Sequence, residues 1–467
     1  MRATTTARFC YGASLATLPF IGVGVLVLAT GRDWGAGLQP SWVFLAAGTV
    51  FCGSTWRRGS SGSSAPGGRG RLVFAVLAAA LLLSALGILI APSAEPASVT
   101  VPRYLRQCIQ LGVMVVFCLW SALWTRGEAR WRWTARLIVA GALVQAGYGA
   151  LQQAAFGEAS AWFARIDAVF TSNPAILAGS EQLYLDDALQ PVPRLRGTAC
   201  EPLYLGNFLL LALPMVLLCR WRAAVAGTVA AALLLLLALT WSRGAWLAAL
   251  AAWAAVAVLW VVFRPGRGER TSGRRPDRRV LVAVSLVVLG LLAVALLADG
   301  SLVLRRLAQT FSARDWSNLT RIFSMQAAWR AFLLSPVVGI GWGQFVWHFP
   351  VLVDPLGLQS QFTWPVVNNF YLAVLCETGL LGFAAMAWGF GEAVRGFLEG
   401  LRRRLRTGGP GGGRLLITGA AAAGVWLQLA TFSQYNLPHI WVALGLWLAA
   451  IREAGTGAAA PAGKVAR

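Results

Sequence analysis

Long, nearly uncharged apolar segments recur along this chain of 467 residues. Most are about 18 to 20 residues long, enough for an α-helix to cross a hydrocarbon core of roughly 30 Å, and the last is shorter. Charged residues make up only 12% of the chain, against about 25% in a soluble domain. The sequence therefore predicts an all-α integral membrane protein with about twelve transmembrane helices. The twelve segments lie near 11–30, 38–55, 72–91, 107–124, 137–156, 203–218, 223–240, 244–263, 280–298, 368–390, 415–432 and 438–451.

Connections rich in Lys and Arg alternate along the chain with connections that are poor in them. With the N-terminus in the cytoplasm, 28 of the 40 Lys and Arg residues fall in the termini and the inside loops, and 12 fall outside. Cytoplasmic loops of membrane proteins carry this excess of positive charge. The sequence therefore predicts a multi-pass membrane protein with both termini in the cytoplasm.

The formal net charge of +22 does not indicate a nucleic-acid-binding protein. The segments expected inside carry this whole surplus, because acidic and basic residues balance in the rest of the chain. Such a distribution serves orientation and attraction to anionic membrane lipids. We therefore expect contacts with membrane lipids and no nucleic acid partner.

The spacing of the segments predicts the organisation of the chain. Spans 1–5 form an N-terminal bundle, spans 6–9 follow a first long extracytoplasmic loop, and spans 10–12 follow a larger loop that contains short helices. The first apolar stretch is not followed by a convincing signal-peptide cleavage site, so we expect it to remain in the protein as a transmembrane span. The predicted regions are 1–156, the loop 157–202, 203–298, the large loop 299–367, 368–452 and a cytoplasmic tail 453–467.

Both long loops carry helical patterns. The stretch SAWFARIDAVF places large apolar residues on one helical face, as expected for a short helix lying on the membrane surface. In the larger loop, SNLTRIFSMQAAWRAFLLSP predicts a helix that starts near Ser317 and stops before Pro336.

Arginines gather in the segments expected outside, against the usual tendency. A guanidinium stays charged and offers five donors in a fork, which suits phosphate oxygens. Some of these arginines instead fit a role as interfacial anchors or partners of nearby aspartates. They are Arg194, Arg196, Arg243, Arg305, Arg306, Arg314, Arg321 and Arg330.

Three titratable residues are candidates for chemistry. Glu201 precedes Pro202 at the outer start of the sixth span, whereas Glu377 lies about 12 Å into the tenth, where a carboxylate is costly unless paired or hydrated. His348 lies in the large loop, and a lone histidine there is more often structural. Each carboxylate fits a salt bridge as well as a catalytic role. The seven cysteines show neither a disulfide framework nor a zinc spacing.

Four stretches in order resemble the bacterial O-antigen ligase and polymerase family, whose members transfer lipid-linked glycans in the membrane. The resemblance implies that this protein lies in the bacterial cytoplasmic (inner) membrane. The resemblance covers about residues 195–385, and the first five spans match only in general character. The stretches are RLRGTACEPLYLGNFLLLALP, TWSRGAWLAAL, RIFSMQAAWRAFLLSPVVGIGWGQF and NNFYLAVLCETGLLGF.

The resemblance implies transfer of an oligosaccharide from a polyprenyl-diphosphate carrier to an acceptor hydroxyl on a glycan or lipid-linked acceptor, without a cofactor or a required metal. Residue by residue, it assigns Arg243 and Arg321 to the substrate diphosphate, with Arg196 as a third. Such a site must stabilise the departing diphosphate and help to deprotonate the acceptor.

The sequence departs from the family where many relatives carry a His-Asn pair, because Asn368-Asn369 stands here. An asparagine accepts no proton usefully. The resemblance then leaves Glu201, His348 or Glu377 as the base. Alternatively, the reaction needs little help from a base. In this family comparison, Asn368 orients the acceptor. The Asn-Asn pair favours a polymerase over a ligase.

Two other classes remain open at this stage. A glycan or lipid transporter also has many spans, although internal repeats or several charged residues deep in the helices would be expected, and neither is evident. A non-catalytic partner in polysaccharide assembly is the second alternative, since the missing histidine is compatible with lost activity.

Overall fold

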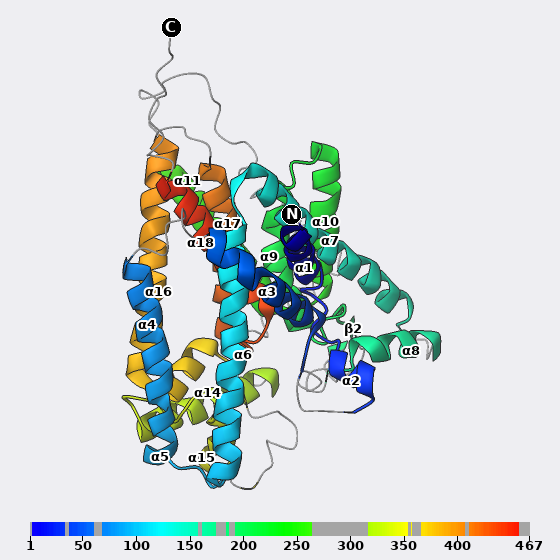
Figure 1. The fold of residues 1–467 in the computed structure, drawn as a ribbon. Helices are drawn as coiled ribbons and strands as arrows, with labels where there is room; N and C mark the ends of the chain where they lie inside the picture. Colours follow the sequence, from blue (N-terminus) through cyan, green and yellow to red (C-terminus); the bar gives the residue numbers. More distant parts are fainter. Residues whose placement is uncertain are drawn as a thin grey trace.

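The computed structural model describes residues 2–32, 37–59, 68–156, 161–173, 184–185, 192–263, 316–353, 356, 366–406 and 411–456. These residues are almost entirely helical (Figure 1). Among them, one short antiparallel ladder pairs β1 (Tyr184–Leu185) with β2 (Val192–Pro193). The expected all-α class is confirmed.

The described helices differ widely in length, from the short α5 to the long α16. In chain order they are α1 (Arg2–Ala16), α2 (Val25–Thr30), α3 (Pro40–Gly59), α4 (Gly68–Leu83), α5 (Gly87–Ile90), α6 (Ala97–Trp124), α7 (Gly127–Ala154), α8 (Ala161–Phe170), α9 (Pro202–Met215), α10 (Ala223–Leu239), α11 (Arg243–Phe263), α14 (Trp316–Leu334), α15 (Phe345–Val353), α16 (Phe370–Arg406), α17 (Gly412–Gln428) and α18 (Pro438–Thr456).

Six helical segments among the described residues are long and apolar enough to cross a membrane. Three shorter apolar helices lie in α3, α9 with its following turn, and α10. The chain is thus a multi-pass membrane protein, and the total of twelve spans stays a prediction. The expected ninth span, 280–298, lies outside the described residues. The six segments are Arg71–Ile90, Ala97–Trp124, Gly127–Ala154, Arg243–Phe263, Phe370–Leu405 and Gly412–Thr431.

The expected first span, 11–30, is not a single helix, and this prediction is wrong. α1 ends at Ala16, and a turn and an extended segment precede α2. Gly22 lies in this break, where its amide donates to Thr198 O at 3.0 Å and a Cβ would lie only 1.9 Å from Phe170 O. The backbone leaves the helix here because it packs directly against the first long loop.

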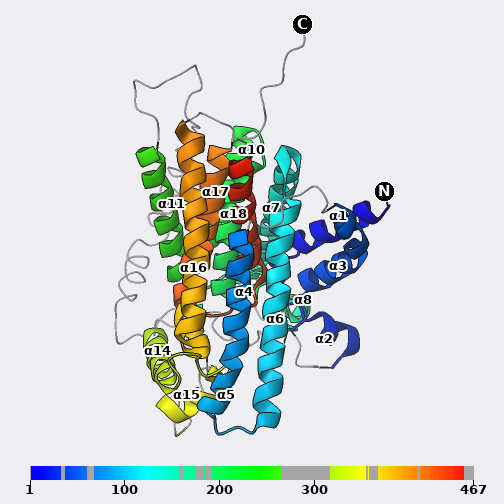
Figure 2. The ribbon, with the colours of Figure 1, turned by 60° about the vertical axis from the view of Figure 1, so that its left-hand side comes forward.

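The long helices run side by side, with α17 in their interior (Figure 2). α17 packs against α9, α11 and α18, and α6 packs against α18. The core that results is rich in aromatic and small residues, so the backbones approach closely.

A second hydrophobic cluster forms where α14 and α15 pack on the start of α16. The helix predicted between Ser317 and Pro336 is confirmed as α14. α14 and α15 lie near α5 at one end of the molecule, away from the end of α16 (Figure 1). The helix predicted in the first long loop is also present, as α8, with Trp162 half exposed.

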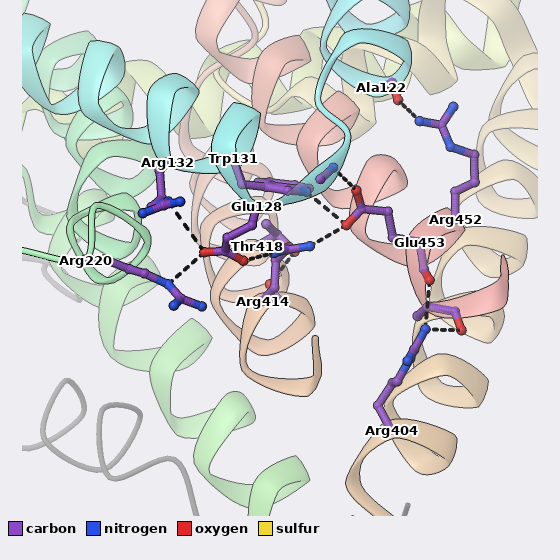
Figure 3. A network of polar contacts seen from close by, with 12 residues as sticks. Ala122, Glu128, Trp131, Arg132, Arg220, Arg404, Arg414, Thr418, Arg452 and Glu453 are labelled. Carbon is purple, nitrogen blue, oxygen red and sulfur yellow. Dashed lines mark hydrogen bonds and ion pairs between the residues drawn. The ribbon is translucent and has the colours of Figure 1, made fainter. Parts of the chain in front are cut away.

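At the other end, a polar network joins the helix ends around Glu453 of α18 (Figure 3). One Glu453 oxygen accepts from the amide of Gly127 at 2.7 Å, and the other accepts from Trp131 Nε1 at 3.0 Å. Arg414 pairs with the same carboxylate, and its guanidinium lies 5.0 Å from the Trp131 ring centre. Glu453 therefore ties the start of α7 to α17 and α18.

Glu128 extends this network to the connection between α9 and α10 (Figure 3). It accepts from Arg414 at 2.6 Å and from Arg220 at 2.7 Å. Arg404, at the end of α16, donates to Glu453 O at 2.9 Å. All of these charged residues come from segments that the charge distribution assigns to the cytoplasm.

The fold therefore gives a direct test of topology. A single cysteine at Ala94, in the exposed connection between α5 and α6, should react with a membrane-impermeant maleimide added to intact spheroplasts. A cysteine at Arg222, which is exposed near the Glu128 network, should react only after the membrane is permeabilised. The reverse pattern would overturn the assignment of the two faces.

Candidate functional site

A pocket enclosing about 490 Å³ of empty space, counted out to its mouth, brings three arginines and one glutamate together. These are Arg194, Arg243, Arg321 and Glu201, and they come from three segments distant in sequence. The rest of the lining consists of Pro202, Leu203, Trp241, Ser242, Gly244 and Thr431. The pocket is therefore a strongly polar site on a mostly apolar protein.

The loop that precedes α9 positions Arg194 and Glu201. The amide of Leu195 donates to Leu239 O at 2.9 Å, and Arg194 Nε donates to Thr240 O at 3.3 Å, so the loop is fixed to the end of α10. Farther along, Thr198 donates its amide to Gln145 Oε1 at 2.8 Å. Both ends of the segment are thus held before the chain reaches Glu201.

Glu201 occupies the N-cap position of α9, and Pro202 is the first residue of that helix, as predicted. Its backbone is extended, and its side chain makes no capping hydrogen bond to the helix. Cys200, directly before it, has a φ of 67°, a conformation that few non-glycine residues adopt. The carboxylate therefore lines the pocket and does not cap the helix terminus.

Arg243 enters the pocket from the tight turn between α10 and α11. Trp241 has a φ of 51°, and the amide of Ser242 donates to Thr240 Oγ1 at 3.2 Å. Gly244 follows, where a Cβ would lie 2.7 Å from Thr431 Oγ1. The close approach of α17's end explains why the sequence has glycine after Arg243.

Arg321 comes from α14, which is held beside α11. Arg243 Nη2 donates to Asn318 Oδ1 at 3.4 Å, one turn before Arg321 on the same helix. Three guanidiniums therefore surround one volume, and their mutual repulsion favours an anion among them.

The electrostatics of the pocket are shaped by burial. Burial lowers the pKa of Arg194 to about 10, Glu201 offsets part of this shift, and Arg321 and Arg243 add to it. Burial also raises the pKa of Glu201 to about 7, and Arg194, Tyr204 and Arg321 offset that shift only in part. The arginines stay charged at neutral pH, while Glu201 exchanges a proton in the same range.

Asn368 lies beside the pocket and not in its lining. Its backbone N–H and its side-chain Nδ2 donate to Ser324 Oγ at 3.2 and 3.3 Å. The Ser324 hydroxyl in turn donates to Arg321 O at 2.9 Å. Asn369 Oδ1 accepts from the amide of Leu372 at 3.0 Å and caps α16. The Asn-Asn pair thus connects the turn that carries Arg321 to the start of α16.

Arg196 points elsewhere, although it was predicted with the diphosphate-binding arginines. It is only 2% exposed and forms an ion pair with Asp167 of α8. Asp167 also accepts from Tyr148 Oη at 2.6 Å. Arg196 therefore links the surface helix α8 to the loop that leads to Glu201, and Arg194 takes its expected place in the pocket.

His348 is buried in the second hydrophobic cluster. Its two ring nitrogens lie 3.2 Å from Gln344 O and 3.1 Å from Ala91 O. Among the described residues, the ring contacts these two backbone carbonyls and does not line the pocket. This arrangement matches the structural interpretation of a lone histidine in this loop.

Glu377 also lies outside the pocket lining, where it supports the glycine-rich stretch 339–343. It accepts from the amide of Phe345 at 3.2 Å, and Glu377 O accepts from the amide of Gly341 at 3.1 Å. A Cβ at Gly339, whose φ is 77°, would lie 2.3 Å from the Glu377 backbone. The alternating glycines therefore let this stretch press against α16.

Arg194 stood among the arginines suited to phosphate but was not assigned to the diphosphate, and Ser242 and Thr431 were not predicted as pocket residues. Arg194 and Arg196 are two positions apart, and only the pairing of Arg196 with Asp167 decides which of them faces the pocket. That pairing is a contact between a surface helix and a loop, which no local pattern encodes.

Fold and pocket together define a multi-pass membrane protein with a polar pocket that three arginines and one glutamate line. The family model described as O-antigen ligase matches residues 208–387, which include the second half of α9, the whole of α11 and α14, and the start of α16. This match confirms the resemblance to the O-antigen ligase and polymerase family. It supports a role in glycan transfer or assembly in the membrane. A search of curated proteins found no match.

Proposed function

We propose that this protein transfers an oligosaccharide from a polyprenyl-diphosphate carrier to an acceptor hydroxyl on the outer face of the bacterial cytoplasmic membrane. The observation that carries the proposal is the gathering of Arg194, Arg243 and Arg321 around one pocket with Glu201. The acceptor is a glycan or a lipid-linked glycan, so the proposal covers both O-antigen or exopolysaccharide polymerases and ligases. It requires neither a metal nor another cofactor.

The chemistry follows from the charges that the reaction creates. The acceptor oxygen attacks the anomeric carbon of the lipid-linked sugar, and the bond from that carbon to the phosphate oxygen breaks. The departing polyprenyl diphosphate carries negative charge, which three pre-positioned guanidiniums stabilise more strongly in a partly buried site than in water. Arg243 and Arg321 contact the diphosphate, and Arg194 is added here as the third arginine.

Glu201 accepts the proton of the acceptor hydroxyl. A base works best when its pKa lies near the pH of the reaction, and burial brings the pKa of Glu201 to about 7. Its carboxylate makes no capping hydrogen bond to the helix; it lines the pocket and is hydrogen-bonded to Tyr204. Asn368 orients the acceptor or the turn that carries Arg321, since it bonds to Ser324.

The arginines give the first functional prediction. Arg243→Ala and Arg321→Ala should each lower the transfer rate by about 100-fold or more, because each removes charge-assisted bonds that strengthen as the diphosphate departs. Lysine at either position should restore only part of the rate, since it lacks the planar fork. The measurement is transfer by purified protein with a synthetic polyprenyl-diphosphate oligosaccharide.

Arg165→Ala is the matched control, because Arg165 is an exposed arginine of α8 on the same expected face. It should keep near-normal activity. Full activity in both Arg243→Ala and Arg321→Ala, with folding confirmed by size-exclusion chromatography, would end the proposed diphosphate contact.

The second functional prediction concerns pH. Because only ionised Glu201 accepts a proton, the transfer rate of the wild type should rise with pH through about 7 and level off above it. Glu201→Gln should remove this rise and lower the plateau by about 100-fold, the range of general-base catalysis. The measurement is the pH profile of transfer at saturating donor.

His348→Gln and Glu377→Gln are the comparison variants for this profile. Both should keep the rise near pH 7, because neither side chain lines the pocket. A Glu201→Gln protein with the full rate, together with loss of the rise in His348→Gln, would transfer the role of base to the histidine. If no variant changed the profile, the reaction would need no base and the arginines would supply most of the catalysis.

A further inference from the structure

Behind the pocket, a chain of buried polar side chains joins three helices to the turn before α11. His439 Nε2 lies 2.9 Å from Asn207 Oδ1, Asn207 Nδ2 lies 3.0 Å from Gln428 Oε1, and Gln428 Nε2 lies 3.4 Å from Ser242 Oγ. Each of these four residues is at most 3% exposed. The chain begins in α18, passes through α9 and α17, and ends at the turn before α11, where Ser242 lines the pocket.

Backbone carbonyls determine the direction of every hydrogen bond in this chain. Asn207 Nδ2 also donates to Val425 O at 3.0 Å, so the opposite atom, Oδ1, must face His439. Gln428 Nε2 also donates to Leu203 O at 3.3 Å, so its Oε1 must face Asn207. A carbonyl oxygen only accepts, and neither amide is able to flip without losing that bond.

It follows that each member donates towards the pocket. His439 must carry its proton on Nε2 to donate to Asn207, which donates to Gln428, which donates to Ser242. The Ser242 oxygen therefore accepts a hydrogen bond from Gln428. Its own proton has no acceptor among the described residues, and Ser242 lines the pocket beside Arg243.

We propose that Ser242 is a further ligand of the anion held by the pocket, and that His439, Asn207 and Gln428 are positioning residues that orient its hydroxyl. The inference rests on the proposed function for the identity of the anion, a polyprenyl diphosphate. A hydroxyl that accepts one hydrogen bond donates more strongly to the next acceptor, because linked hydrogen bonds polarise one another.

The neighbouring backbone supports this role for Ser242. A Cβ at Gly206 of α9 would lie 3.4 Å from the Ser242 Cβ, so α9 closes directly over the serine. The left-handed backbone of Trp241 sets the direction in which the turn leaves α10. Both features restrict the serine to the position in which Gln428 reaches its oxygen.

The test measures binding and transfer in the same purified variants. Ser242→Ala should weaken binding of polyprenyl diphosphate and of inorganic pyrophosphate, and should lower the transfer rate by about tenfold, since a hydrogen bond to a charged group is lost. The pH profile of Ser242→Ala should still rise near 7. Thr418→Ala, a buried hydroxyl on α17 bonded only to its own helix, is the matched control and should match the wild type.

The chain is tested through His439. His439→Phe keeps an aromatic ring against Phe208, whose centroid is 5.7 Å away, but removes the donor, and it should lower transfer several-fold. His439→Gln offers a nitrogen in a similar place and should recover most of the activity. Combined with Ser242→Ala, His439→Phe should cause no additional loss, because both act through one hydroxyl. If His439→Phe does not fold, Gln428→Met replaces it in the same comparison.

Unchanged binding and transfer in Ser242→Ala would overturn the role of the serine. Full additivity of the double variant would overturn the role of the chain and leave His439 as a packing residue. A wild-type protein that binds no polyprenyl diphosphate would instead contradict the proposed function. Pyrophosphate binding by the wild type and Ser242→Ala would then still decide whether the serine is an anion ligand.

Discussion

The repulsion among three guanidiniums held around one pocket is the constraint on which the site depends. Three positive charges at partly buried positions raise the free energy of the folded chain unless an anion or a carboxylate offsets them. Local structure holds the three arginines in place despite this repulsion. Arg194 is hydrogen-bonded to the end of α10, Arg243 is the first residue of α11, and α14 carries Arg321. Glu201 supplies one negative charge in the lining, and the proposed diphosphate adds further negative charge beside the guanidiniums.

Arginines take part in two different kinds of site in this protein. Around Glu453 and Glu128, arginines form ion pairs with the two carboxylates, and the contacts fasten helix termini together (Figure 3). In the pocket, three arginines and one glutamate line a single volume, and hydrogen bonds from Arg194 to Thr240 O and from Arg243 to Asn318 help to position the guanidiniums. The first group of charges joins parts of the fold, whereas the second lines a cavity. This contrast separates the structural arginines from those proposed to contact substrate.

Hydropathy and charge asymmetry predicted the helical class, α8, α14 and the start of α9, because these features depend on local periodicity and on Pro202 or Pro336. The break at Gly22 was not predictable, since it arises from packing against a loop about 150 residues later. The motifs similarly selected Glu201, Arg243 and Arg321, which do share a pocket. They gave no means of choosing Arg194 over Arg196, because that choice depends on Asp167, and no means of finding the chain from His439 to Ser242.

The most direct test of the central claim is the position of a bound polyprenyl diphosphate in a cryo-electron microscopy structure of the purified protein in lipid. The account predicts density for both phosphorus atoms in the pocket, within hydrogen-bonding distance of the guanidiniums of Arg243 and Arg321 and close to Arg194. Density for the diphosphate beside Arg196 or in the network around Glu453, with the pocket empty at saturating lipid, would contradict it.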